Sequence, residues 1–178
     1  MTNSAYSLLG PRVAIRHLRR QDYEELTALG RESAEMLDRW LGTRDDTVEA
    51  FEKYLERFER PSHEGFVICL RATHGIVGGV NINNIVRGAL QSGTLGFTAY
   101  ASTTGRGYMT EGVGLAIRLA FGPLGLHRLE ANIQPDNAPS RKLAERLGFR
   151  REGYSSFFQR VNGEWRDHER WALTAEAA

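Results

Sequence analysis

The sequence predicts a mixed α/β domain in which helices come early, antiparallel strands follow, and two further helices alternate with the last strands. Three observations predict this class. Apolar residues recur at helical spacing before Pro61 and in short, strand-like runs from Gly65 onward. A glycine-containing loop at residues 103–108 separates a strand-like run from a helix-like one. Asn162-Gly163 lies between two more strand-like runs, and Asn-Gly is the strongest short signal for a β-hairpin.

The first part of the chain is predicted to hold one strand and two helical segments. The strand covers residues 13–18, where apolar and β-branched residues predominate. Asp22 is expected to cap a helix that ends near Gly30, because Asp is a favoured residue at helix N-termini. A second helical piece is expected over residues 33–41.

A third helix is predicted before Pro61. Asp46 and Glu49 have the three-residue spacing of a capping box, and the helix is expected to run to about Arg60. An apolar stripe at helical spacing marks the face that we expect to pack on the core: Phe51, Tyr54, Leu55 and Phe58.

Six further strands and two helices are predicted after Pro61. The strands cover residues 66–70, 76–85, 95–100, 128–133, 149–158 and 165–173. The helices cover residues 109–121 and 137–147, and Gly148 is expected to close the second one in the C′ position. Thr73-His74-Gly75 supplies the turn between the first two of these strands.

Length and composition favour one soluble domain over residues 1–178. Hydrophobic residues make up 41% and charged residues 25%, and the formal net charge is +1, which argues against a nucleic-acid-binding domain. No apolar run approaches the roughly 18 residues of a membrane-spanning helix. The first residues lack the pattern of a secretory signal, so we expect a cytoplasmic protein.

Cysteine and histidine usage predicts neither a disulfide framework nor a metal site. Cys69 is the single cysteine and lies within an apolar run, so we expect it to be a buried small hydrophobe. The five histidines show no ligand spacing.

Charge is distributed unevenly along the chain. Residues 31–60 carry nine acids and six bases, whereas residues 141–170 carry eight bases and five acids. Two interpretations stay open at this point. These segments are either two solvated helical surfaces, or an acidic patch for a cationic substrate and a basic patch for an anionic cofactor.

The loop before the helix at 109–121 has the composition of an anion-binding turn. Two closely spaced glycines let several backbone N–H groups point in one direction, and the following helix adds the positive end of its dipole. Arg106 could add a positive charge. The residues of this candidate phosphate site are Gly105, Arg106, Gly107, Tyr108, Met109 and Thr110.

Other interpretations of this loop are an ordinary turn, a P-loop and a dinucleotide-binding turn. On these residues alone an ordinary loop before a helix is an equally open alternative. A P-loop is excluded, because no Gly-Lys-Ser/Thr follows the glycines. A dinucleotide-binding turn would need a third glycine, and Glu130 lies in the middle of a strand where that fold places an acid at a strand end.

The segment that follows is similar to the GNAT superfamily of acyl-CoA-dependent N-acetyltransferases. Asn137, Ser140 and Leu147-Gly148-Phe149 match the family pattern of a strand, an Asn, a Ser or Ala three residues on, a short helix and Leu-Gly-Phe. The glycine loop matches the family's pyrophosphate loop. It departs at Thr104, where Arg or Gln is usual, and at Met109, where Gly or Ala is usual.

Within the superfamily the chain resembles the Rim-type ribosomal-protein-alanine N-acetyltransferases from about residue 12 to about residue 173. The stretches that carry this resemblance are Asn84-Ile85-Val86-Arg87-Gly88, Leu95-Gly96-Phe97, Met109-Thr110-Glu111, Leu126-His127-Arg128, Glu152-Gly153-Tyr154 and Gly163-Glu164-Trp165-Arg166-Asp167-His168. The resemblance implies a mostly antiparallel sheet of about seven strands with helices on both faces. It also implies that the strands before and after the loop helix splay apart.

The resemblance implies acetyl-CoA as cosubstrate and no metal. The pantetheine arm would lie between the splayed strands, with the backbone of Phe97, Thr98 and Ala99 as its partners, and Asn137 would bond it from the other side. Ordinary strand pairing and a plain helix cap are the alternatives for these residues.

The implied reaction is direct attack of a neutral amine on the thioester. Many relatives place a Tyr acid where this chain has Ala144, so Ser140 is the candidate donor to the departing sulfur, unless its hydroxyl only bonds the local backbone. Glu130 is the candidate base, directly or through a water, with an ion pair to Arg128 as the alternative. Asn132 lies on the same strand face and is a candidate substrate contact.

The acceptor is the least determined part of the prediction. Glu35 and Trp40 would form one wall of the substrate slot, unless the early helices present only a solvated face. An α-amino group has a pKa of about 7.7–8.0 and needs less help from a base than a lysine does. The leading interpretation is therefore acetylation of a protein N-terminus, by resemblance a ribosomal protein that begins with Ala. The alternatives are a small amine such as a polyamine or aminoglycoside, and a CoA-binding regulatory module without turnover. No nucleic-acid or membrane partner is expected, and the chain would be a monomer or a homodimer.

Overall fold

One eight-stranded sheet runs through the molecule, which is described over residues 7–178 by a computed structural model. The strand order is β1-β2-β3-β4-β5-β6-β8-β7, and every neighbouring pair is antiparallel except β5 and β6. The strands are β1 (Leu8–Leu9), β2 (Val13–His17), β3 (Glu64–Leu70), β4 (Ile76–Val86), β5 (Ser92–Ala99), β6 (Arg128–Ile133), β7 (Arg150–Val161) and β8 (Glu164–Thr174).

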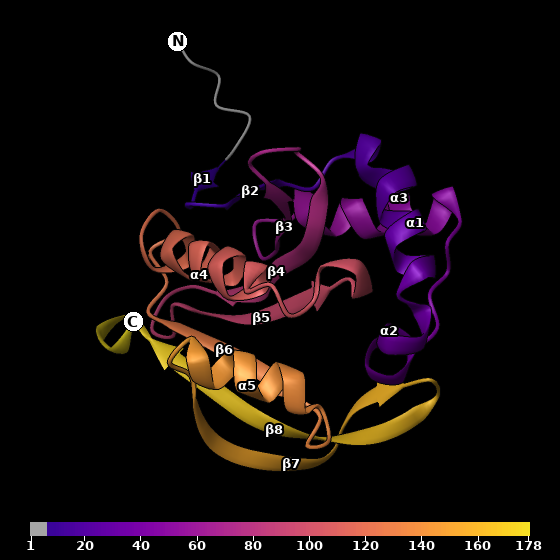
Figure 1. Cartoon of the computed structure of the whole chain (residues 1–178). Coiled ribbons are helices and arrows are strands. Elements are labelled where there is room, and N and C mark those ends of the chain that lie inside the picture. The colour runs from indigo at the N-terminus through magenta and orange to yellow at the C-terminus, as the bar shows by residue number, and fades with distance from the viewer. Residues whose placement is uncertain (1–6) are drawn as a thin grey trace.

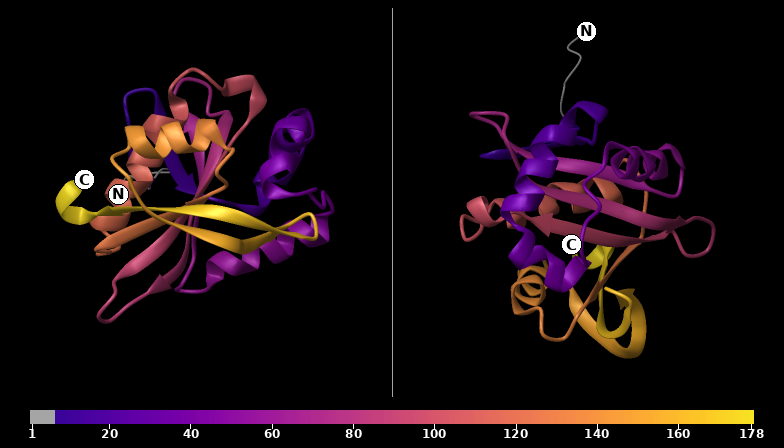
Figure 2. Two further views of the ribbon diagram at one scale, coloured as in Figure 1. Left: turned by 90° about the horizontal axis from the view of Figure 1, so that it is seen from below. Right: turned by 90° about the vertical axis from the view of Figure 1, so that its right-hand side faces the viewer.

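Helices cover both faces of this sheet, as Figures 1 and 2 show. Three lie on one face and two on the other: α1 (Tyr23–Glu32), α2 (Ala34–Leu41) and α3 (Val48–Glu56), then α4 (Tyr108–Phe121) and α5 (Ala138–Arg146). The predicted fold class is thereby confirmed. The prediction of about seven strands missed the two-residue β1. The prediction that the N-terminus is not a secretory signal concerns residues that lie partly outside the described ones. Within residues 7–178, no helix is long and apolar enough to span a membrane.

Alternating side chains of β3 supply two separate apolar cores. Ile68 packs towards α4, where Gly112 permits close approach: a Cβ there would lie 2.5 Å from the Ile68 Cγ2. Val67 and Cys69 face the smaller cluster under α1 and α2. Cys69 is fully buried, and burial raises the pKa of its thiol, which confirms its prediction as a buried small hydrophobe.

The sequence-based expectation for Asp22 was wrong in its hydrogen bonding. Its carboxylate does not cap α1 but accepts two hydrogen bonds from the Arg16 guanidinium, at 2.8 and 2.9 Å, and one from the Arg19 backbone N–H. The pair is buried, with side-chain exposures of 14% for Arg16 and 4% for Asp22. It therefore fastens the start of the helical layer to β2.

The capping box predicted at Asp46 and Glu49 is also wrong, by one residue. Thr47 is the N-cap of α3, and its hydroxyl accepts from the Ala50 N–H at 3.2 Å. The Asp46 carboxylate instead accepts from Arg31 Nε at 3.0 Å. A tertiary ion pair has replaced the local cap.

The parallel pairing between β5 and β6 is short. Backbone pairing covers Ser92–Arg128, Gly93–Leu129 and Thr94–Glu130 and then stops. On its other side β5 stays paired with β4 as far as Ala99. The predicted splay is thus confirmed, and one edge of β5 is left open in the middle of the sheet.

Replacing Asp22 with Ala should lower the free energy of unfolding by about 3 kcal/mol or more, because removal of one partner leaves a buried guanidinium uncompensated. Urea denaturation of the two proteins measures this difference. The matched control is Glu52→Ala, which breaks the exposed pair with Arg20 and should cost less than about 1 kcal/mol. Equal losses in the two variants would contradict the structural role given to the Arg16–Asp22 pair.

Candidate active site

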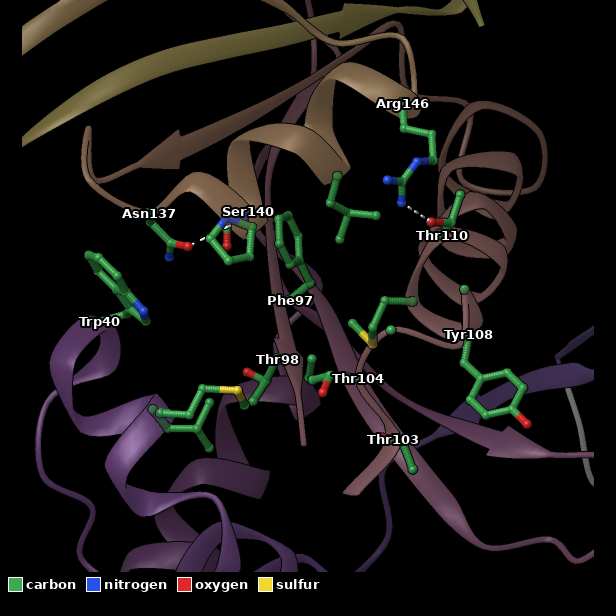
Figure 3. Close-up of a pocket in the computed structure, with 18 of the residues that line it drawn as sticks. Trp40, Phe97, Thr98, Thr103, Thr104, Tyr108, Thr110, Asn137, Ser140 and Arg146 are labelled. Carbon is green, nitrogen blue, oxygen red and sulfur yellow. Dashed lines mark hydrogen bonds between the residues drawn. The ribbon is translucent and has the colours of Figure 1, made fainter. Parts of the chain in front are cut away.

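A cavity of about 440 Å³ opens where β5 and β6 part, and Figure 3 shows it in close-up. We call it the loop cavity. Residues of α2, β5, the glycine loop, α4 and α5 line it: Met36, Leu37, Trp40, Leu41, Phe97, Thr98, Ala99, Thr103, Thr104, Gly105, Gly107, Tyr108, Met109, Thr110, Asn137, Pro139, Ser140, Leu143 and Arg146. The structure therefore brings together nearly all the residues predicted from sequence for a cofactor.

The glycine loop has the backbone geometry that its sequence predicts. Gly105 and Gly107 have φ values of +76° and +78°, in the left-handed region that side chains disfavour. The first bond within α4 joins the Glu111 N–H to the Gly107 carbonyl. The N–H groups of Tyr108, Met109 and Thr110 precede this bond and lie at the positive end of the helix.

Arg12 braces this loop from outside. Its Nη1 donates to the Arg106 carbonyl at 2.9 Å, and its Nε donates to the Glu111 carboxylate at 2.9 Å. Burial of Glu111 opposes ionisation, but hydrogen bonds from Arg12 and Val13 outweigh it and lower the pKa of this carboxyl. A carboxylate on α4 and an arginine at the start of β2 thus hold the loop in shape.

The positive charge at the loop cavity comes from a residue that sequence analysis missed. The Arg106 side chain is not part of the lining, whereas Arg146 on α5 lines the cavity and donates to the Thr110 hydroxyl at 3.0 Å. Arg146 is the single charged residue of the lining within the described chain. Arg146 lies one turn of helix after Lys142 on α5. No motif in the sequence distinguishes Arg146 from this neighbouring base.

Asn137 and Ser140 have parts of their side chains free. The Asn137 Oδ1 accepts from the Ser140 N–H at 3.2 Å, as a helix cap does, which leaves the amide Nδ2 to face the cavity. The alternative predicted for Ser140, a bond from its hydroxyl to the local backbone, is not found within residues 7–178. Figure 3 shows both residues at the start of α5, with Trp40 drawn below Asn137.

Besides Arg106, three residues predicted from sequence lie outside the loop cavity: Glu130, Asn132 and Glu35. The Glu130 carboxylate accepts from Arg128 Nε at 2.8 Å, so the ion pair left open as an alternative is present. Arg128 also binds Glu152, and these bonds hold the pKa of Arg128 above its usual value. Asn132 is half-buried opposite Arg170 in β8, and Glu35 is exposed on α2. None of the three faces the Ser140 side of the site.

A second cavity, of about 390 Å³, lies on the face of the sheet that α1–α3 cover. We call it the helix-side cavity. It shares Leu41 and Thr98 with the loop cavity, so the two cavities meet at the open edge of β5. Its lining comprises Leu18, Tyr23, Leu26, Thr27, Leu41, Arg44, Asp45, Asp46, Thr47, Ala50, Phe51, Tyr54, Gly65, Phe66, Val67, Gly79, Val80, Asn81, Thr98 and Tyr100.

The residues of α2 that line the loop cavity form what we call the α2 wall: Met36, Leu37, Trp40 and Leu41. Hydrogen bonds from residues far away in the sequence fix the end of this helix. Gln134, just after β6, donates to the Trp40 carbonyl at 3.0 Å. Asn162, in the turn of the β7–β8 hairpin, accepts from the Thr43 N–H at 2.9 Å and donates to the Asp38 carbonyl at 3.2 Å. Figures 1 and 2 show the hairpin reaching the end of α2. Because each partner is more than 90 residues away in sequence, no local pattern predicts these contacts.

The chain is similar in sequence and structure to known acetyltransferases, and the similarity includes the residues of the loop cavity. A family model described as an acetyltransferase (GNAT) domain matches residues 12–150. A Bacillus subtilis (strain 168) protein named probable N-acetyltransferase YjcK is 34% identical over 173 residues, which cover 93% of this chain and 96% of that protein. The ribosomal protein uS5-alanine N-acetyltransferase of Escherichia coli (strain K12) is 39% identical over 99 residues, 56% of this chain and 51% of that enzyme. The structure of Mycobacterium smegmatis RimJ in complex with CoA-disulfide has a TM-score of 0.85 at 30% identity and covers 92% of this chain and 82% of that one.

Proposed function

Because the chain belongs to the GNAT acetyltransferase family, we propose that it transfers acetyl from acetyl-CoA to the α-amine of a protein N-terminus, in the manner of the ribosomal-protein-alanine enzymes. Two relatives support this. RimJ, at 30% identity, has been solved with CoA-disulfide, and an alanine N-acetyltransferase matches over 56% of this chain. Membership of a family of N-acetyltransferases favours an enzyme over a binding module without turnover.

One observation carries the proposal: the open edge of β5 leads to the N-terminus of α4, where backbone N–H groups can bind an anion. The unpaired edge of β5 at Phe97–Ala99 can bond an extended pantetheine arm as a sheet edge bonds an added strand. Beyond the end of β5 lie the N–H groups of the glycine loop, which suit a pyrophosphate. Arg146 would add charge there, and the Asn137 Nδ2 would bond the arm from the α5 side.

Acetyl transfer requires that the departing CoA sulfur is stabilised and that the amine nitrogen loses a proton. The amine nitrogen attacks the thioester carbonyl carbon, the carbon–sulfur bond breaks, and the sulfur leaves with its electron pair. We assign the proton that reaches the sulfur to the Ser140 hydroxyl, because Ala144 on the same helix has no acidic group. The nitrogen loses its own proton to water, and water returns a proton to the Ser140 oxygen, so that the products are the amide and the CoA thiol.

The lack of a base in the described lining of the loop cavity favours an α-amine. The lining of the loop cavity in residues 7–178 has no carboxylate and no histidine. An α-amine with a pKa of about 7.7–8.0 is partly neutral near pH 7.5, whereas a lysine at about 10.4 is almost fully protonated. In this proposal the amine reaches the acetyl group from the helix-side cavity, past Thr98 and beside Trp40.

Replacing Gly107 with Val should raise the Kd for acetyl-CoA by about tenfold or more, which corresponds to about 1.4 kcal/mol. A branched side chain would stand where the phosphate approaches, and its Cβ would lie 3.2 Å from Arg12 Nη2. Titration calorimetry measures the change. Gly163→Val is the matched control, since Gly163 has a φ of +80° but lies in the hairpin turn. Similar affinities in both folded variants would show that the loop does not hold the cofactor.

Ser140→Ala should lower kcat by a factor of about 10²–10⁴, the usual contribution of a positioned proton donor. The KM for acetyl-CoA should change little, because the backbone N–H of residue 140 still bonds Asn137. Steady-state kinetics at saturating peptide measures both constants. A kcat close to that of the unaltered enzyme would leave water as the acid.

A peptide that begins with Ala should be acetylated faster than the same peptide with a blocked N-terminus and free lysines. The rate should rise from pH 6.5 and level off above about pH 8, because the reactive neutral α-amine has then reached its full population. Intact mass after incubation with acetyl-CoA locates the acetyl group. Equal rates on the two peptides would reject N-terminal specificity, and turnover of a polyamine or aminoglycoside alone would identify a small-amine enzyme.

A further inference from the structure

Arg44 is a charged group of the helix-side cavity that the proposed function has not used. It lies in the connection between α2 and α3, and its guanidinium packs against the backbone of α1: a Cβ on Gly30 would lie 3.0 Å from the Arg44 Cζ. Among residues 7–178, no carboxylate lies within ion-pair distance of this guanidinium. Arg44 therefore brings to the cavity lining an exposed guanidinium that has no ion-pair partner in this part of the chain.

The two carboxylates of this cavity are already engaged. Asp46 accepts from Arg31 Nε at 3.0 Å. Asp45 accepts from the Thr47 hydroxyl at 2.7 Å and from the Thr47 N–H at 3.0 Å, and these bonds lower its pKa. The charge of Asp46 is therefore balanced by Arg31, whereas Asp45 is held by its own loop and keeps its charge.

Two phenols of the cavity, Tyr100 and Tyr54, can donate hydrogen bonds. Tyr100 is 4% exposed, and burial raises the pKa of its phenol despite the opposing effect of Arg44, so it stays protonated. Asn81 Nδ2 donates to the Tyr54 hydroxyl oxygen at 3.2 Å, which leaves the Tyr54 proton free for another acceptor. A guanidinium with neutral phenols beside it is a donor set for an anion, and Arg binds carboxylates in a two-bond geometry.

We propose that the helix-side cavity recognises a carboxylate carried by the acetyl acceptor, and that Arg44 binds this carboxylate. The inference rests on the proposed function for the position of the reacting amine, next to Thr98 where the two cavities meet. The cavity volume of about 390 Å³ suits a small polar group and the atoms that link it to the amine. The carboxylate has two sources: an acidic side chain early in a protein, or the carboxylate of a small amino-acid-like amine.

Two matched pairs of acceptors distinguish these sources in the full-length enzyme. One pair is a C-terminally amidated peptide that begins Ala-Glu and its Ala-Gln counterpart. The other is an alanine-containing dipeptide as the free acid and as the amide. We expect kcat/KM to favour the carboxylate by about tenfold or more, or about 1.4 kcal/mol, in at least one pair. The pair that shows the preference identifies the source.

Arg44 variants assign the preference to this side chain. Arg44→Gln should abolish the preference while the KM for acetyl-CoA is unchanged, and Arg44→Lys should retain part of it, since it keeps the charge but loses the two-bond geometry. Arg118→Gln, on the exposed side of α4, is the matched control and should keep the full preference. If Arg44 only packs on α1, Arg44→Gln would change the stability of the protein but not the ratio of kcat/KM values between the two acceptors of each pair.

Calorimetry of the same acceptors, without turnover, separates failure of the inference from failure of the proposed function. Turnover without any preference for a carboxylate, or a preference that persists in Arg44→Gln, overturns the inference and leaves the acetyltransferase assignment intact. An Arg44-dependent binding preference in a protein that acetylates none of these peptides supports the carboxylate site and overturns the N-terminal substrate.

Discussion

β5 and β6 run parallel and share a register only as far as Thr94 and Glu130. Beyond that point the peptide groups on one edge of β5 lack the neighbouring strand that a continuous sheet would supply, and unpaired backbone groups are costly wherever water is excluded. The cost is contained because the edge faces a cavity, where water or a ligand can bond it. The glycine loop, α5 and the end of α2 are arranged around this interruption, and together with β5 they line the loop cavity.

The two cavities differ in how the chain builds them. Apart from the α2 wall, the loop cavity is assembled from residues 97–146, a continuous part of the sequence with its own turn and cap signals. The helix-side cavity draws on segments from Leu18 to Tyr100 that come together only through the sheet. Its charge balance is set by tertiary pairs such as Arg31–Asp46. The proposed cofactor site is thus built mostly from one continuous segment, whereas the proposed acceptor site depends on packing across the domain.

This difference explains what could be predicted from the sequence. The strands, the loop and the Asn137 cap rest on local periodicity, glycine and capping chemistry, and they were predicted close to their observed bounds. Local capping rules predict Asp22 and Asp46 as helix caps. In the structure, Asp22 instead binds Arg16 on β2 and Asp46 binds Arg31 on α1. Glu130 could be placed on a polar strand face, but whether that face meets the cavity depends on the sheet as a whole. Arg44 carried no local signal at all.

Asn162 joins the hairpin turn to Thr43 and Asp38 across 119 and 124 residues of chain. Contacts of such long sequence separation are formed at a high cost in loop entropy and cannot exist before the last hairpin has been synthesised. During translation, the elements that line most of the loop cavity leave the ribosome first, while the α2 wall lacks its final anchor. The position of α2 is therefore a property of the finished chain. A nascent or C-terminally shortened protein would retain most elements of the loop cavity without the contacts that fix α2 beside the proposed acceptor site.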